Sequence, residues 1–218
     1  ENVVKLLVFC HPQDDDKTAK MQIARVKRLF TAARRNGLKI KLHADQLSDR
    51  GGAALAAEYN AVSAEHLEYV SPEGIRKLAG SGTVAVSLPL ASLYLGEPYL
   101  PARTLLEAGV PVAVATDFNP GSAPSYHLPL AMTLACLNQA MTPQETLNGV
   151  TTVAARAIGR FPGLVAAGGC PRPRTLLPGF HDTARRLTAL REARDGGAGD
   201  LLVPQMVDWM AKHLGEKA

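Results

Sequence analysis

Two histidines and one aspartate stand where predicted strands end. His43 and His66 each close a short predicted strand, and Asp117 follows the apolar run of residues 110–115. Two imidazoles and a carboxylate suit a divalent metal with nitrogen and oxygen ligands, or a general base beside a metal-bound water. The structural alternatives are that Asp117 forms the turn before Asn-Pro-Gly, and that the histidines bond a loop or lie buried. A fold that brings the three side chains together would favour the metal.

Polar groups beside Asp117 suit a small polar or anionic ligand. Asn119 offers an amide, Ser122 a hydroxyl, and Gly121 a backbone N–H that no side chain shields. The structural alternative for these residues is a tight turn ahead of a helix. The remaining histidines are predicted to be structural or exposed, and they are His11, His127, His181 and His213.

An alternating order of strands and helices would carry these side chains to one edge of a sheet. Apolar or alternating runs predict strands at residues 3–10, 38–43, 61–66, 83–88 and 110–115. Helical patterns follow them at residues 21–33, 52–60, 71–80, 98–108, 128–140 and 142–158. About five βα units predict an α/β protein with a parallel sheet, whose strands all end at one edge. The count fits either an open doubly wound sheet or part of a (β/α)8 TIM-type barrel.

The composition of the chain argues against some classes of binding partner. The chain has 218 residues, of which 46% are hydrophobic and 20% charged, as in ordinary soluble globular proteins. A net charge of +4 with few aromatic residues does not favour nucleic acid. No apolar run reaches membrane-spanning length, so no membrane partner is predicted. The three distant cysteines lack CxxC spacing, which predicts reduced thiols and a cytoplasmic protein.

The composition changes near residue 160. Residues 159–179 are rich in glycine and proline, which predicts an irregular segment. Residues 181–194 and 201–214 have helical patterns. We therefore predict two parts: a partial barrel at residues 1–160, and an irregular, helical C-terminal extension at residues 161–218 whose packing the sequence does not predict.

Several stretches of the chain occur in an order that is typical of one family. KLHADQ and SAEHLEY lie within residues 41–69, and they are followed by SGTVAVSLP at residues 81–89. VPVAVATDFNPGS occupies residues 110–122, and LACLNQAMTPQETLNGVTTVAARAIGR occupies residues 134–160. Together they resemble imidazolonepropionase, the histidine-degradation member of the metal-dependent amidohydrolases. The resemblance covers roughly residues 25–160 and implies the barrel alternative.

The resemblance also implies roles for individual residues. His43 would be a metal ligand at the end of barrel strand five, and His66 would assist at the reacting centre after strand six. Asp117 would be the strand-eight ligand that also handles the proton of the metal-bound water. The implied reaction opens the ring of 4-imidazolone-5-propanoate with water to give N-formimidoyl-L-glutamate, using one divalent metal, zinc or iron. The implied substrate contacts are Gln46, Asn119, Gly121 and Ser122.

Parts of the family pattern are absent from this sequence. It contains no His-x-His pair, which supplies two further metal ligands in the family, and no upstream substrate-binding Arg, Tyr and His segment. The Gly/Pro-rich stretch replaces the family's return to a small β-sandwich. Residues 3–37 resemble instead the barrel-like domain at the C-terminus of some myo-inositol catabolism kinases. With two of four ligands, the chain is expected to bind a metal weakly or not at all.

Two further functions stay open beside the imidazolonepropionase-like hydrolase. The first is a non-catalytic half-barrel, as a fragment, a fusion or a designed recombination. Such a half-barrel would bind a small carboxylate, or would form a homo-oligomer that covers its open sheet edges. The second is a sugar-phosphate aldolase-like barrel, which needs a Schiff-base lysine. Lys39 and Lys41 lie on a predicted strand, but the sequence does not place partners around them.

Overall fold

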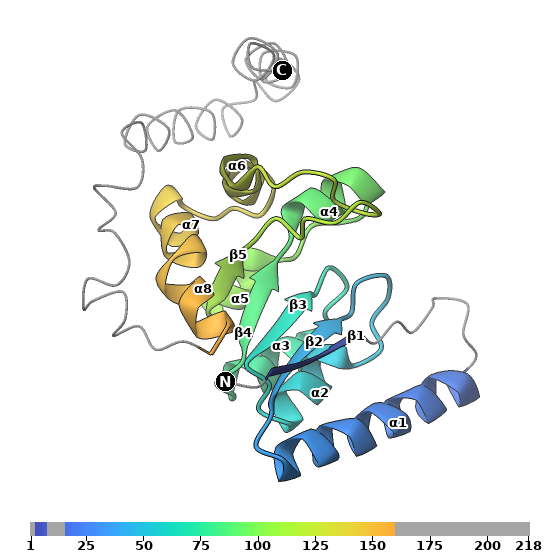
Figure 1. Cartoon of the computed structure of the whole chain (residues 1–218). Coiled ribbons are helices and arrows are strands. Elements are labelled where there is room, and N and C mark those ends of the chain that lie inside the picture. Colours follow the sequence, from blue (N-terminus) through green and yellow to red (C-terminus); the bar gives the residue numbers. More distant parts are fainter. Residues whose placement is uncertain (1–2, 8–15, 160–218) are drawn as a thin grey trace. The chain divides into compact units, whose positions relative to one another are not determined.

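The computed structural model of the chain describes residues 3–7 and 16–159 (Figure 1). The chain divides into two units, Glu1–Arg172 and Pro173–Ala218, and every described residue belongs to the first. The predicted C-terminal extension, residues 161–218, lies outside the described residues. The predicted division near residue 160 therefore stays a prediction.

Five parallel strands form one sheet in the order of the sequence. They are β1 (Val3–Leu7), β2 (Lys39–Ala44), β3 (Ser63–His66), β4 (Val84–Ser87) and β5 (Val112–Val114). Each strand pairs in parallel with the next one along the chain. A doubly wound sheet reverses its strand order at a switch point, whereas a barrel adds its strands in sequence. The α/β class and the partial-barrel prediction are therefore confirmed.

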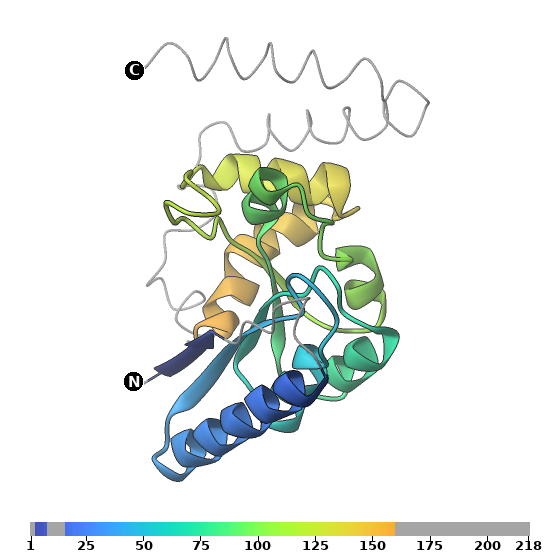
Figure 2. The same cartoon turned by 90° about the vertical axis from the view of Figure 1, so that its right-hand side faces the viewer.

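Helices connect the strands and follow the last one (Figures 1 and 2). Figure 2 shows α1 as a long helix running along the outside of the strands. Within the residues described, no helix is long and apolar enough to cross a membrane. The helices are α1 (Asp16–Arg35), α2 (Gly52–Glu58), α3 (Pro72–Ala79), α4 (Pro89–Leu95), α5 (Ala102–Glu107), α6 (Leu128–Asn138), α7 (Pro143–Val150) and α8 (Thr152–Ala157).

Side chains cap three of the helices at their first turn. The Ser71 hydroxyl accepts a hydrogen bond from the Gly74 N–H, as expected for an N-cap. Thr142 and Glu145 form the predicted capping box of α7. His127 Nδ1 accepts from the Leu130 N–H at 3.1 Å and so caps α6, which agrees with its predicted structural role. Each of the three helices has a proline at its first or second position, where the missing N–H costs no intrahelical hydrogen bond.

The sequence prediction missed α4. Its residues, PLASLYL, follow Pro89 directly after β4, and the apolar run carried no polar face from which to infer a helix. Pro89, Leu90, Ala91 and Ser92 are buried, so tertiary packing stabilises this short helix. The strand β5 is shorter than the predicted residues 110–115, although backbone hydrogen bonds continue the pairing at both of its ends.

The two faces of the sheet carry different side chains. Ile40, Leu42 and Ala44 alternate along β2 and belong to the hydrophobic core. The residues between them, Lys41 and His43, face the opposite side. Lys41 pairs in register with Ser63 of β3, and His43 pairs with Glu65. One face of β2 and β3 is therefore polar, although its side chains are largely buried.

The polar face contains a buried ion pair. Lys41 Nζ lies 3.0 Å from Glu65 Oε1, and the two side chains are only 16% and 5% exposed. The Ser63 hydroxyl donates a hydrogen bond to the same Glu65 oxygen. An unpaired buried charge lowers the stability of the fold by several kcal/mol, so each partner offsets part of the cost of burying the other.

We expect Lys41→Met to lower the free energy of unfolding by about 3–5 kcal/mol, because Glu65 would keep a buried charge without its cation. Adding Glu65→Gln removes that charge and should recover most of the loss. Denaturant titration of both variants measures the difference. Equal losses in the single and double variants would contradict this role of the ion pair. The matched control is Lys77→Met, which breaks a bridge between side chains 52% and 63% exposed and should cost less than about 1 kcal/mol.

Close packing of α2 against α3 depends on Gly74. A Cβ at this position would lie 2.9 Å from Ala53 Cβ and 3.0 Å from Val70 Cγ2. We expect Gly74→Ala to destabilise the protein by about 1–3 kcal/mol, because overpacking outweighs the better helix propensity of alanine. In Gly82→Ala the new Cβ would meet no atom within 4 Å, so the control should change stability by less than about 0.5 kcal/mol. Equal unfolding midpoints for the two variants would disprove the packing argument.

Candidate functional site

The imidazoles of His43 and His66 lie side by side. Their ring centroids are 4.7 Å apart, with the ring planes tilted by 47°. Both residues are buried, with exposures of 7% and 1%. They come from the carboxyl ends of neighbouring strands, His43 from β2 and His66 from β3. The predicted convergence of the two histidines is therefore present in the structure.

An unusual backbone conformation accompanies this approach of the rings. By register, His66 pairs with Ala44, a core residue, so regular alternation would place its ring on the core face. The φ angle of His66 is instead +76°, in the left-handed region. That region is costly for a residue with a Cβ and persists only where the surroundings impose it. We attribute the turn of the His66 ring toward His43 to this left-handed end of β3.

Glu68 and Ser92 extend the histidine pair into a polar cluster. His66 Nδ1 lies 3.4 Å from Glu68 Oε1, and both side chains are 2% exposed. The Ser92 hydroxyl, on α4, donates to the same carboxylate oxygen at 3.3 Å. The sequence interpretation missed both residues. The one available signal was the spacing of Glu68 two positions after His66, and α4 itself was not predicted.

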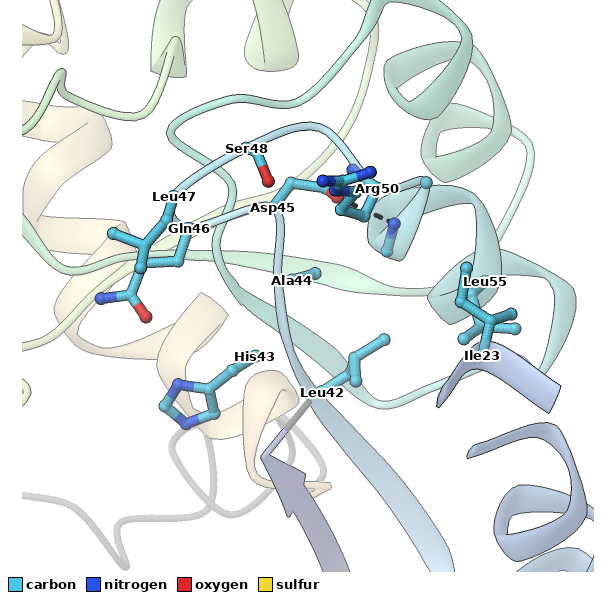
Figure 3. Close-up of a pocket in the computed structure, with 12 residues that line it drawn as sticks. Ile23, Leu42, His43, Ala44, Asp45, Gln46, Leu47, Ser48, Arg50 and Leu55 are labelled. Carbon is cyan, nitrogen blue, oxygen red and sulfur yellow. Dashed lines mark hydrogen bonds between the residues drawn. The ribbon is translucent and has the colours of Figure 1, made fainter. Parts of the chain in front are cut away.

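Gln46 lines a small hollow beside β2 (Figure 3). The same hollow is lined by His43, Asp45 and Arg50, and Figure 3 shows Gln46 and His43 on the side of the strand opposite Arg50. Gln46 and His43 therefore lie on the same side of β2. The hollow extends from the end of β2 along the loop that precedes α2.

Asp45 has a structural role in this loop. Its carboxylate accepts backbone hydrogen bonds from Arg50, Gly52 and Ala53 at 2.8–3.0 Å. It therefore satisfies N–H groups at the start of α2, as a capping carboxylate does. Burial raises the pKa of Asp45 above its ordinary value, and the three backbone hydrogen bonds oppose that rise.

The loop after β5 is held together by Asn119. The Asn119 amide donates to the Asp117 carbonyl at 2.7 Å, and its Oδ1 accepts from the N–H groups of Gly121 and Ser122 at 2.9 and 2.8 Å. These polar groups thus form hydrogen bonds with one another, as expected if the residues form a tight turn ahead of a helix. Asp117 itself has a φ of +53° and is partly exposed. The contacts of this loop with a substrate stay a prediction.

A complete metal centre does not form from the residues described. Structural and catalytic zinc sites use three or four protein ligands. Across residues 3–7 and 16–159, no three His, Cys, Asp or Glu side chains form a group that could hold a metal ion. The structure therefore brings His43 and His66 together but does not add Asp117 to them as a third ligand. The described donor set does not by itself fit zinc or iron.

Imidazolonepropionases are similar to a large part of this chain. The enzyme of Burkholderia multivorans is 52% identical over 139 residues, which are 63% of this chain and 34% of that enzyme. The enzyme of Geobacillus kaustophilus is 50% identical over 134 residues, 62% of this chain and 32% of that enzyme. The chain spans about one third of the length of the curated relatives that it matches.

The fold also matches a solved adenosine deaminase. The adenosine deaminase of Xanthomonas campestris with bound zinc superposes with a TM-score of 0.53 at 22% identity, covering 62% of this chain and 36% of that one. This likeness concerns the fold alone.

The N-terminal part of the chain matches a different family. Residues 1–62 match a family described as "Uncharacterized protein conserved in bacteria (DUF2090)". The predicted resemblance of this part to inositol catabolism kinases stays a prediction. The resemblance of the larger part is confirmed: at about 50% identity, some 63% of this chain is similar to one third of an imidazolonepropionase.

Proposed function

We propose that this chain supplies part of an imidazolonepropionase-type active site. The reaction would be the hydrolytic opening of 4-imidazolone-5-propanoate to N-formimidoyl-L-glutamate. The observation that carries the proposal is the buried pair of imidazoles at the ends of β2 and β3. The similarity to imidazolonepropionases over the same part of the chain supports it.

Each predicted site residue has a role that its chemistry allows. Asp117 offers a partly exposed carboxylate that can take up and return a proton. His66 would stabilise charge that develops on the opening ring. His43 and Asp117 are the proposed ligands of one divalent metal, zinc or iron, which activates water when bound. The proposed contacts to the substrate are Gln46, Asn119, Gly121 and Ser122.

The described residues do not complete the ligand set, and this limits what the chain does alone. Metal affinity depends on the number and geometry of ligands, so two ligands bind zinc or iron poorly. We therefore propose that the further ligands come from outside the described residues. By itself the chain is expected to give no measurable turnover.

One observation favours the second candidate, binding without catalysis. No group of three potential ligands lies within the described residues, yet the hollow that Gln46 and His43 line is present. In that case the chain would hold a small carboxylate such as N-formimidoyl-L-glutamate and leave it unchanged. Assembly into a homo-oligomer, which would cover the sheet edges, stays a prediction of the same candidate.

A complementation experiment tests the catalytic proposal. The full chain is mixed with the part of the Geobacillus kaustophilus imidazolonepropionase that lies outside its 134 matched residues, with Zn²⁺ or Fe²⁺ added. We expect loss of the imidazolone absorbance in the mixture and in neither part alone. Asp117→Asn in the chain should lower the rate by about 10²–10⁴-fold, because it removes the proton carrier.

The matched control is Glu107→Gln, which changes an exposed carboxylate on α5 and should leave the rate unchanged. Size-exclusion chromatography shows whether the two parts associate. An associated mixture that gives no turnover with either metal rules out the catalytic function. Binding of N-formimidoyl-L-glutamate to the chain, measured by calorimetry, would then support the second candidate.

A further inference from the structure

We propose that Glu68 is the positioning residue of His66: its carboxylate accepts a hydrogen bond from Nδ1 and leaves Nε2 to face the reacting centre. This inference rests on the proposed function for the role of His66 at that centre. It assigns a task to a buried carboxylate that the proposed reaction does not otherwise use.

The chemistry of the two groups sets the direction of the hydrogen bond. An ionised carboxylate only accepts hydrogen bonds, so in the proposed arrangement the proton lies on His66 Nδ1, which is 3.4 Å from Glu68 Oε1. A neutral imidazole carries one ring proton, and Nε2 is then the acceptor. Glu68 therefore selects one of two tautomers. In doing so it also restricts rotation of the ring.

Ser92 also holds the Glu68 carboxylate in place. Its hydroxyl donates to Glu68 Oε1 at 3.3 Å, and the residue is 3% exposed. Glu68 Oε2 is also buried, and within the described part of the chain it has no hydrogen-bond partner. A carboxylate buried with so few donors is costly, which is typical of a group kept for its effect on a neighbour.

The backbone between the two residues is shaped to bring them together. His66 and Leu67 are both left-handed, with φ angles of +76° and +66°, although neither is glycine. The Leu67 N–H donates to the Ala44 carbonyl and the Tyr69 N–H to the Asp45 carbonyl, each at 2.9 Å. These bonds tie the turn to the end of β2. Two successive strained residues persist only where the surrounding structure imposes them.

The tautomer can be measured on the full chain without any activity. Long-range ¹H–¹⁵N spectra of histidine-labelled protein at about pH 8, above the ordinary histidine pKa, report which ring nitrogen is protonated. The signals of His66 are identified by their loss in His66→Gln. We expect protonation on Nδ1 in the wild type. In Glu68→Gln the amide can donate as well as accept, so the ratio of the two tautomers should shift at least about tenfold.

Glu97→Gln is the matched control for the spectra. The Glu97 carboxylate accepts a hydrogen bond at 2.7 Å from the hydroxyl of Tyr69, on the same loop, so a general disturbance of the loop would appear in this variant too. It should leave the His66 tautomer unchanged. If Glu68→Gln does not fold, Ser92→Ala removes only the hydroxyl and should give a smaller shift in the same direction. Protonation of His66 on Nε2 in the wild type overturns the proposal without any variant.

Kinetics of the complemented mixture supply the second measurement. A positioning residue should affect the chemical step, so Glu68→Gln is expected to lower kcat about 10–100-fold with little change in KM. An unchanged kcat despite a shifted tautomer would overturn the positioning role. Absence of turnover in the wild-type mixture would instead refute the proposed function, and the spectra would still decide what Glu68 does to His66.

Discussion

The register between β2 and β3 is the constraint on which the site depends. It sets Lys41 opposite Ser63 and His43 opposite Glu65, and so it gathers four polar side chains on one face. Side chains alternate with a period of two, so a slip of one residue would move all of one strand's polar groups into the hydrophobic core. Core residues such as Ile40 and Leu42 make that slip prohibitive. The apolar face therefore determines the geometry of the polar one.

A second feature sets this polar face apart from an ordinary core. Its ionic and imidazole groups are largely buried from water. Such burial costs stability, and hydrogen bonds and ion pairs offset the cost only in part. The left-handed residues after β3 add further strain. Energetic costs concentrated at one edge of a sheet are typical of a site retained for binding or chemistry.

Much of this arrangement could be predicted from the sequence. Buried parallel strands are continuous apolar runs, and their ends are marked by turn-forming residues, so the positions of His43 and His66 followed from local patterns. The separation of 4.7 Å between the two ring centroids could not be predicted from local patterns, because it depends on a positive φ at a non-glycine residue. Asp117 illustrates the same limit. Its place after β5 was predictable, but its relation to the histidines depends on sheet curvature, which no local pattern encodes.

The role proposed for Glu68 could not be predicted from the sequence. Its partner Ser92 sits on α4, a helix that exists because tertiary contacts bury one side of an almost wholly apolar segment. A carboxylate two positions from a histidine is common on any protein surface. Here the two side chains are in contact because the turn between them is buried. Sequence patterns report local structure well. They report contacts between distant segments only where a family resemblance carries that information.

The strand order has a consequence for how such a chain arises. Because each described strand pairs with its sequence neighbour, a βα unit interacts mainly with the unit before it and the unit after it. A terminal unit can then be exchanged by recombination while the remaining ladder keeps its register. The similarity of residues 1–62 to one family and of a larger part of the chain to imidazolonepropionases fits this kind of exchange. The topology thus permits a chain to arise by recombination of parts from different proteins.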